Sequence, residues 1–147
     1  MKFSNVIRLI TYVLLFISIY KGTESISNND PRKGLKEFLS IGVIPTSFLA
    51  AVRHIFLSGQ IIKGGRFFEF EAGGANLGIA IAALVAYLYN MSNQVMGIIF
   101  LIYAIYLLMG SVAWAIYKPQ GRMVIWMAKF LSTTAALGYF SYIAFTN

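Results

Sequence analysis

Five apolar stretches alternate with short polar connections along the chain. Each is about as long as the roughly 20 residues that a membrane-spanning helix needs, and none shows the polar–apolar alternation of a half-buried strand. The stretches are residues 4–20, 38–59, 69–89, 95–117 and 123–145. The pattern predicts an all-α fold, a polytopic transmembrane helix bundle of about five spans.

The polar connections divide the chain into three parts. Residues 1–21 are expected to form an N-terminal anchor helix, which stays attached because no small-residue cleavage site follows Tyr20. Residues 22–37 are expected to be a polar loop, since Asn28-Asn29-Asp30-Pro31 is a strong turn signal. Residues 38–147 would then form a four-helix transmembrane bundle, with further turns at 60–66 and 118–122. The anchor helix would lie at its periphery, because it has no face of small residues.

Composition supports the membrane interpretation. Hydrophobic residues make up 59% of the 147 residues and charged residues 12%, against about 25% charged in a soluble domain. The net charge is +7, but the basic residues gather at the ends of the apolar stretches, where they would contact anionic lipid headgroups. We therefore expect the lipid bilayer as a partner and no nucleic acid.

The basic residues also predict an orientation. With five spans, eight of the 12 lysines and arginines lie on the side of the N-terminus and four on the other side. The positive-inside rule then places the N-terminus in the cytoplasm. We expect the inner (cell) membrane of a bacterium, although an organelle or virion membrane stays open.

Two features predict how the helices pack. Gly74, Gly78 and Ala82 are spaced by four, so they form a stripe of small residues along which another helix can approach closely. Pro45 lies inside the second stretch and is expected to kink that helix.

Ionisable residues near the second and third stretches form a candidate polar cluster. Glu69 is expected only to complement the helix dipole. Glu71 lies two residues further into the same helix. Arg53 and His54 are the nearest partners for Glu71, at the end of the preceding stretch on the same side of the membrane. A buried pair linking the two helices is the favoured interpretation, and a proton- or ligand-handling site and solvated charges are alternatives. Asn76 is expected to bridge to a neighbouring helix.

The sequence offers little for catalysis or metal binding. One histidine and two nearby acids are too few ligands for a transition-metal site. The chain has no cysteine, and no hydrolase, zinc-protease or nucleotide-binding motif occurs. We expect no catalytic residue, no metal and no cofactor.

The phrase Phe68-x-Phe70-Glu71-x-Gly73-x-Ala75-Asn76-Leu77-Gly78 resembles one found in an uncharacterised family of small bacterial four-helix integral membrane proteins. His54-Ile55-Phe56 is similar to a phrase that precedes it there. The resemblance implies a shared helix layout and functional importance for Glu71, Asn76 and His54. The chain departs from the family at residues 110–114, where an acid and a histidine would be expected. A weaker likeness to DoxX-type membrane proteins implies the same architecture.

Three functions are compatible with these features. The first is a structural or accessory subunit that packs against other membrane protein subunits, or against copies of itself. The second is a small transporter or channel-like protein with a polar pocket at Arg53, His54 and Glu71. The third is an intramembrane enzyme acting on a lipid or quinone, which would need His54 or Glu71 as its acid or base.

Overall fold

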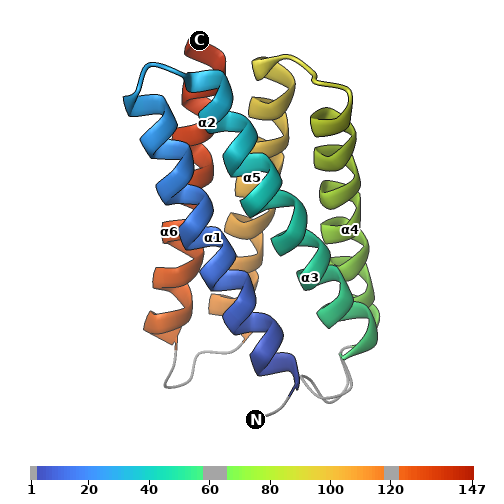
Figure 1. The fold of residues 1–147 in the computed structure, drawn as a ribbon. Helices are drawn as coiled ribbons and strands as arrows, with labels where there is room; N and C mark the ends of the chain where they lie inside the picture. The colour runs from blue at the N-terminus through green and yellow to red at the C-terminus, as the bar shows by residue number, and fades with distance from the viewer. Residues whose placement is uncertain (1–2, 58–65, 118–122) are drawn as a thin grey trace. The chain divides into compact units, whose positions relative to one another are not determined.

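The computed structural model describes residues 3–57, 66–117 and 123–147, and the fold is all-α. The turns expected at 60–66 and 118–122 lie almost wholly outside the described residues, apart from Arg66, which begins a helix. The helices form two compact units, Met1–Met91 (unit 1) and Ser92–Asn147 (unit 2). Figure 1 shows the helices of each unit.

Unit 1 contains three long helical segments. α1 spans Phe3–Ser27, and a second segment is built from α2 (Pro31–Glu37), a π-helical stretch η1 (Phe38–Val43) and α3 (Ile44–Phe56). α4 spans Arg66–Leu88 and packs on α3 and η1. α1 and α4 run in one direction and the α2–α3 segment in the other (Figure 1).

Unit 2 is a helical hairpin of α5 (Asn93–Tyr117) and α6 (Met123–Thr146). Among its described residues, the largest fully buried side chains belong to Met96, Phe100, Leu137 and Phe140. The rings of Phe100 and Phe140 meet edge to face, with their centroids 6.4 Å apart. This aromatic geometry adds to the area that the two rings bury.

The length and apolar character of the helices match a membrane protein. Within the described residues, four helices are long and apolar enough to cross a bilayer: Asn5–Ser27, Pro31–Phe56, Glu69–Leu88 and Asn93–Val112. α6 has 24 residues, which at 1.5 Å per residue is about 36 Å and sufficient for a fifth span. The prediction of an all-α bundle of about five spans is confirmed at this level.

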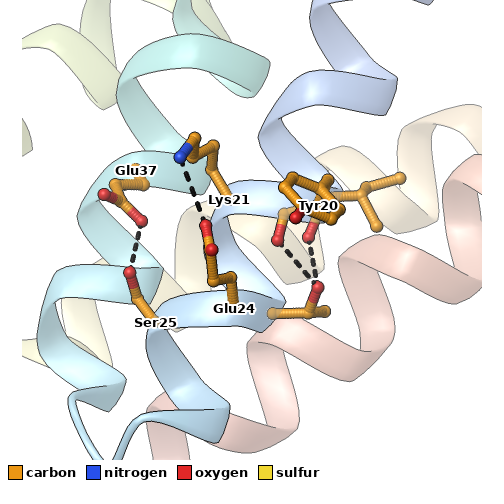
Figure 2. A network of polar contacts seen from close by, with 7 residues as sticks. Tyr20, Lys21, Glu24, Ser25 and Glu37 are labelled. Atoms are coloured by element: carbon orange, nitrogen blue, oxygen red, sulfur yellow. Dashed lines mark hydrogen bonds and ion pairs between the residues drawn. The ribbon is translucent and has the colours of Figure 1, made fainter.

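The prediction of a polar loop at 22–37 is wrong. α1 continues to Ser27, and α2 begins at Pro31, so only a short turn separates them. The polar residues of this region pair with one another on the helices: Lys21 Nζ lies 3.2 Å from Glu24, and Ser25 Oγ donates a 2.6 Å hydrogen bond to Glu37 (Figure 2). The polar residues of this region therefore belong mostly to the ends of two helices, α1 and α2, and not to a long loop.

The turns after α1 and α4 share one design. Asn29 and Asn90 have positive φ, at 61° and 52°, a conformation that asparagine tolerates better than most residues. In each turn the residue after the asparagine donates a 3.0 Å hydrogen bond to the carbonyl five residues earlier, which is Ser25 or Ala86. These are Schellman motifs, which satisfy carbonyls at the end of the helix.

α1 packs closely on the α2–α3 segment. A Cβ atom added at Gly34 would lie 2.5 Å from the carbonyl oxygen of Gly22, and one added at Gly42 would collide with Ser18. The small residues that permit this approach include Gly22, which lies in the region expected to be a loop. The boundary drawn at residue 21 therefore hid the packing face of α1.

Pro45 lies in a continuous helix and does not end it. The π-helical stretch Phe38–Val43 comes directly before it. Proline has no N–H to donate to the carbonyl of Ile41, and its ring crowds that carbonyl. The wider turns of η1 relieve this crowding. Thr46 Oγ1 lies 3.5 Å from the carbonyl of Val43 and donates a hydrogen bond to it.

Candidate functional site

A pair of ionisable side chains connects the end of α3 to the start of α4. His54 Nδ1 forms a hydrogen bond with the Glu69 carboxylate. Glu69 is almost fully buried, with 4% of its surface exposed, and His54 is partly buried. A buried carboxylate requires such a partner, because desolvating an unpaired charge is costly.

Arg53 extends the pair into a chain of three residues. Its Nη2 atom lies 3.0 Å from His54 Nε2. A guanidinium group can only donate hydrogen bonds, so His54 Nε2 must accept, and the proton of a neutral imidazole then sits on Nδ1. Nδ1 donates in turn to the Glu69 carboxylate. The hydrogen bonds therefore run in one direction, from Arg53 through His54 to Glu69.

A second arginine contributes charge to this site. Arg8, near the start of α1, lies close enough for its charge to act on His54. The site thus combines two guanidinium groups, one imidazole and one buried carboxylate, and it draws on α1, α3 and α4.

Gly73 allows α3 and α4 to come close enough for this pairing. A Cβ atom at Gly73 would lie 2.5 Å from Ile55 Cγ1 and 3.4 Å from His54 Cβ. Ile55 is β-branched, so it has little freedom to move away. Gly73 is one helical turn beyond Glu69, so the close approach and the ion pair lie on the same face of α4.

The structure corrects the choice of carboxylate. Arg53 and His54 come together as predicted, but their partner is Glu69, and Glu71 is exposed. Two residues along an α-helix correspond to about 200° of rotation, so the two acids point to opposite sides of α4. The sequence predicted Glu71 as the partner because it lies deeper in the membrane than Glu69. Glu69 lies seven residues, or about two turns, before the buried Asn76, so it lies on the same buried face of α4.

Asn76 is buried, with 2% of its surface exposed. Its side-chain nitrogen donates a 2.7 Å hydrogen bond to the carbonyl of Ala72 in its own helix. It occupies the same face of α4 as Glu69 and Gly73, one turn further along. Asn76 therefore belongs to the inner face of unit 1, and its bridge to a neighbouring helix stays a prediction.

The stripe of Gly74, Gly78 and Ala82 lies on the other face of α4. Within unit 1 all three residues are exposed, and no atom of another element lies within 4 Å of a Cβ built at either glycine. The face toward α3 and η1 carries instead Gly73, Ala80 and Ala83. The predicted close approach along this stripe is thus not made within unit 1, and it stays a prediction for a partner outside that unit.

Sequence reasoning missed Glu69 and Gly73. Both lie on the helix face that carries Ala83, Ala80 and Asn76. They are found by continuing the alternate spacing of three and four residues along that face toward the start of α4. No family model, curated protein or solved structure matches the chain. No group of three His, Asp or Glu side chains gathers as a metal site among the described residues.

Proposed function

We propose that this chain is a structural or accessory subunit of a larger membrane assembly. The observation that supports this best is the outer face of α4, where a row of small residues leaves open space along a helix apolar enough to span the bilayer. In lipid, helices associate through close packing and not through the hydrophobic effect, so such a face is suited to another transmembrane helix.

Larger residues complete this face. Ile81 and Val85 lie on the same side of α4 as Gly78 and are 54% and 38% exposed. Glycines with aliphatic side chains beside them form a groove with a ridge, which is the shape that helix–helix packing uses. The proposed occupant is an apolar transmembrane helix of another subunit.

The polar site has a structural role in this proposal. Arg53, His54 and Glu69 satisfy one another and join α3 to α4. The chain of hydrogen bonds would hold α4 at a fixed rotation, and a fixed rotation keeps its small residues pointing outward. The site therefore orients the docking face without itself contacting the partner.

The orientation of the chain and the type of membrane are proposed from the sequence. The distribution of basic residues supports a cytoplasmic N-terminus. The resemblance of residues 68–78 to small bacterial membrane proteins supports a bacterial inner membrane.

Gentle extraction followed by native mass spectrometry tests the proposal. We expect the wild-type chain to co-purify with a stoichiometric larger complex, and Gly78→Leu to lose that complex while keeping its helix content. Gly138→Leu is the matched control, because Gly138 on α6 also has no atom within 4 Å of an added Cβ. A wild-type chain recovered alone, or equal loss in both variants, would contradict the proposal.

A proton-coupled transporter is the second candidate. It is favoured by the directional chain from Arg53 to Glu69, because an imidazole can both accept and donate a proton. Proteoliposomes loaded with a pH-sensitive dye test it. Proton flux that disappears in both His54→Gln and Glu69→Gln, with unfolding stability retained in one of them, would favour transport over the accessory role.

A further inference from the structure

The opposite end of unit 1 carries a cleft that the proposed function does not use. It is open to its surroundings, and its volume is about 600 Å³. Residues from two separate parts of the chain line it: Arg32, Lys33 and Lys36 from α2, and Tyr87 and Leu88 from the end of α4.

Three basic residues line the cleft against two acids, Asp30 and Glu37, and each acid accepts a hydrogen bond from unit 1. Asp30 Oδ1 accepts a 3.0 Å hydrogen bond from the backbone nitrogen of Lys33 and so caps α2. Glu37 accepts the hydrogen bond from Ser25 on α1 (Figure 2). Neither the Lys33 nor the Lys36 ammonium group has an anionic partner within the described part of unit 1.

Arg32 gives the cleft a fixed wall. Its Nη2 atom lies 3.0 Å from Asn90 Oδ1, 3.2 Å from the Asn90 carbonyl and 3.4 Å from the Met91 carbonyl. All three acceptors are uncharged, and these contacts tie α2 to the turn after α4. Arg32 therefore fixes one wall of the cleft.

The position of the cleft matches a membrane interface. The candidate spans Asn5–Ser27 and Glu69–Leu88 end at this side of unit 1, and Pro31–Phe56 begins there. Tyr87 and Leu88 are 43% and 66% exposed, and they offer an aromatic and an aliphatic surface next to the charges. Tyrosine is enriched at this depth because its ring is amphipathic.

We propose that this cleft binds a phosphate-bearing anion, with Lys33 and Lys36 contacting the phosphate and Tyr87 and Leu88 contacting the adjacent apolar part. Lysine binds phosphate as a point charge, and basic residues at a membrane surface attract anionic lipids. The phosphate can belong to an anionic phospholipid headgroup or to a soluble phosphate ester, and both present the same chemistry to the cleft.

Two binding measurements separate the sources. In the first, the full chain is placed in nanodiscs of phosphatidylcholine with increasing phosphatidylglycerol, and native mass spectrometry counts the anionic lipids retained after release. In the second, sn-glycerol 3-phosphate is titrated into the chain in pure phosphatidylcholine nanodiscs. A lipid site gives a signal in the first, and a soluble-ester site in the second.

Variants connect either signal to the cleft. We expect Lys36→Gln and Lys33→Gln each to weaken binding about fivefold, and Lys36→Arg to retain it. Lys21→Gln is the matched control, since Lys21 lies in α1 near the same end, pairs with Glu24 and does not line the cleft. Lys33 is exposed, so its substitution should leave the fold unchanged.

The proposal is overturned if neither measurement gives saturable binding, or if Lys21→Gln weakens binding as much as the cleft variants do. It does not depend on the accessory role, because the outer face of α4 and the cleft are changed by different substitutions.

Discussion

Unit 1 and unit 2 accommodate buried polar atoms in different ways. Residues 1–91 contain all five acids and the single histidine of the chain, and unit 1 buries a carboxylate by pairing side chains from two helices. In unit 2 the buried polar side chains among those described are Ser111 and Ser141. Their hydroxyls donate to backbone carbonyls of Leu108 and Gly97.

The difference predicts different sensitivities. A buried ion pair fails when one partner is removed, because the other charge is left in an apolar environment. A hydroxyl bonded to a carbonyl can be removed at little cost, so unit 2 should depend mainly on the fit of its side chains. Substitutions that remove a charged or hydrogen-bonding group should therefore destabilise unit 1 most, and substitutions that change side-chain volume should destabilise unit 2 most.

The largest expected effect is at the buried carboxylate. Glu69→Ala should lower the free energy of unfolding by about 3 kcal/mol, since Arg53 and His54 lose their anionic partner. Glu71→Ala is the matched control on the same helix, and as an exposed residue it should change stability by less than about 0.5 kcal/mol. Unfolding in mixed micelles with increasing dodecyl sulfate measures both. Equal effects would show that the pair does not stabilise unit 1.

Gly73 provides the next test in unit 1. Gly73→Leu should cost about 2 kcal/mol because the new side chain collides with Ile55 and separates α3 from α4. Gly74→Leu, one residue further along, enters open space and should not destabilise the isolated chain. The same micelle titration compares them, and a larger loss in Gly74→Leu would mean that the inner and outer faces of α4 are assigned the wrong way round.

Unit 2 should respond to a smaller change in volume. Gly97→Ala places a Cβ 2.8 Å from that of Ala144, so we expect a loss of about 1 kcal/mol as α5 and α6 move apart. Gly110→Ala, on α5 with no atom within 4 Å, should be neutral or stabilise the helix by up to about 1 kcal/mol. Thermal unfolding in detergent followed by circular dichroism distinguishes the two. Similar melting temperatures for the two variants would contradict the close contact at Gly97.

The smallest expected effect is at the buried hydroxyl of unit 2. Ser141 Oγ donates a 3.0 Å hydrogen bond to the Gly97 carbonyl, and Ser141→Ala should cost about 0.6 kcal/mol, the average for such bonds in membrane helices. Thr146→Ala, at an exposed position of α6, is the control. A loss from Ser141→Ala as large as that from Glu69→Ala would abolish the contrast between the units.

The helices could be predicted from the sequence because apolar length alone limits what can cross a bilayer. The exact ends could not, since polar residues such as Ser25 and Glu37 look like a loop until their hydrogen bond across two helices is known. Polar composition measures exposure to water in an isolated segment, and it does not reveal a partner that is distant in sequence.

The candidate site was predicted only in part for a related reason. Arg53 and His54 were identified by their position near the end of a span, but position along a helix does not give rotation about its axis. The choice between Glu69 and Glu71 depends on that rotation, which is set by the contact of Gly73 with Ile55. Small residues on both faces of α4 made the two faces indistinguishable by hydrophobicity.

The lengths of the helices in unit 1 have a consequence for the choice of bilayer. α1 has 25 residues, the α2–α3 segment 26 and α4 23, which correspond to about 38, 39 and 35 Å against a hydrocarbon thickness of about 30 Å. All three are longer than that thickness, so they tilt or extend into the headgroup layer. A thicker membrane would draw Ser25 and Glu37 toward hydrocarbon, whereas a thinner one would expose apolar turns, each with a cost of hydrophobic mismatch. Membrane thickness should therefore influence where in a cell unit 1 is most stable.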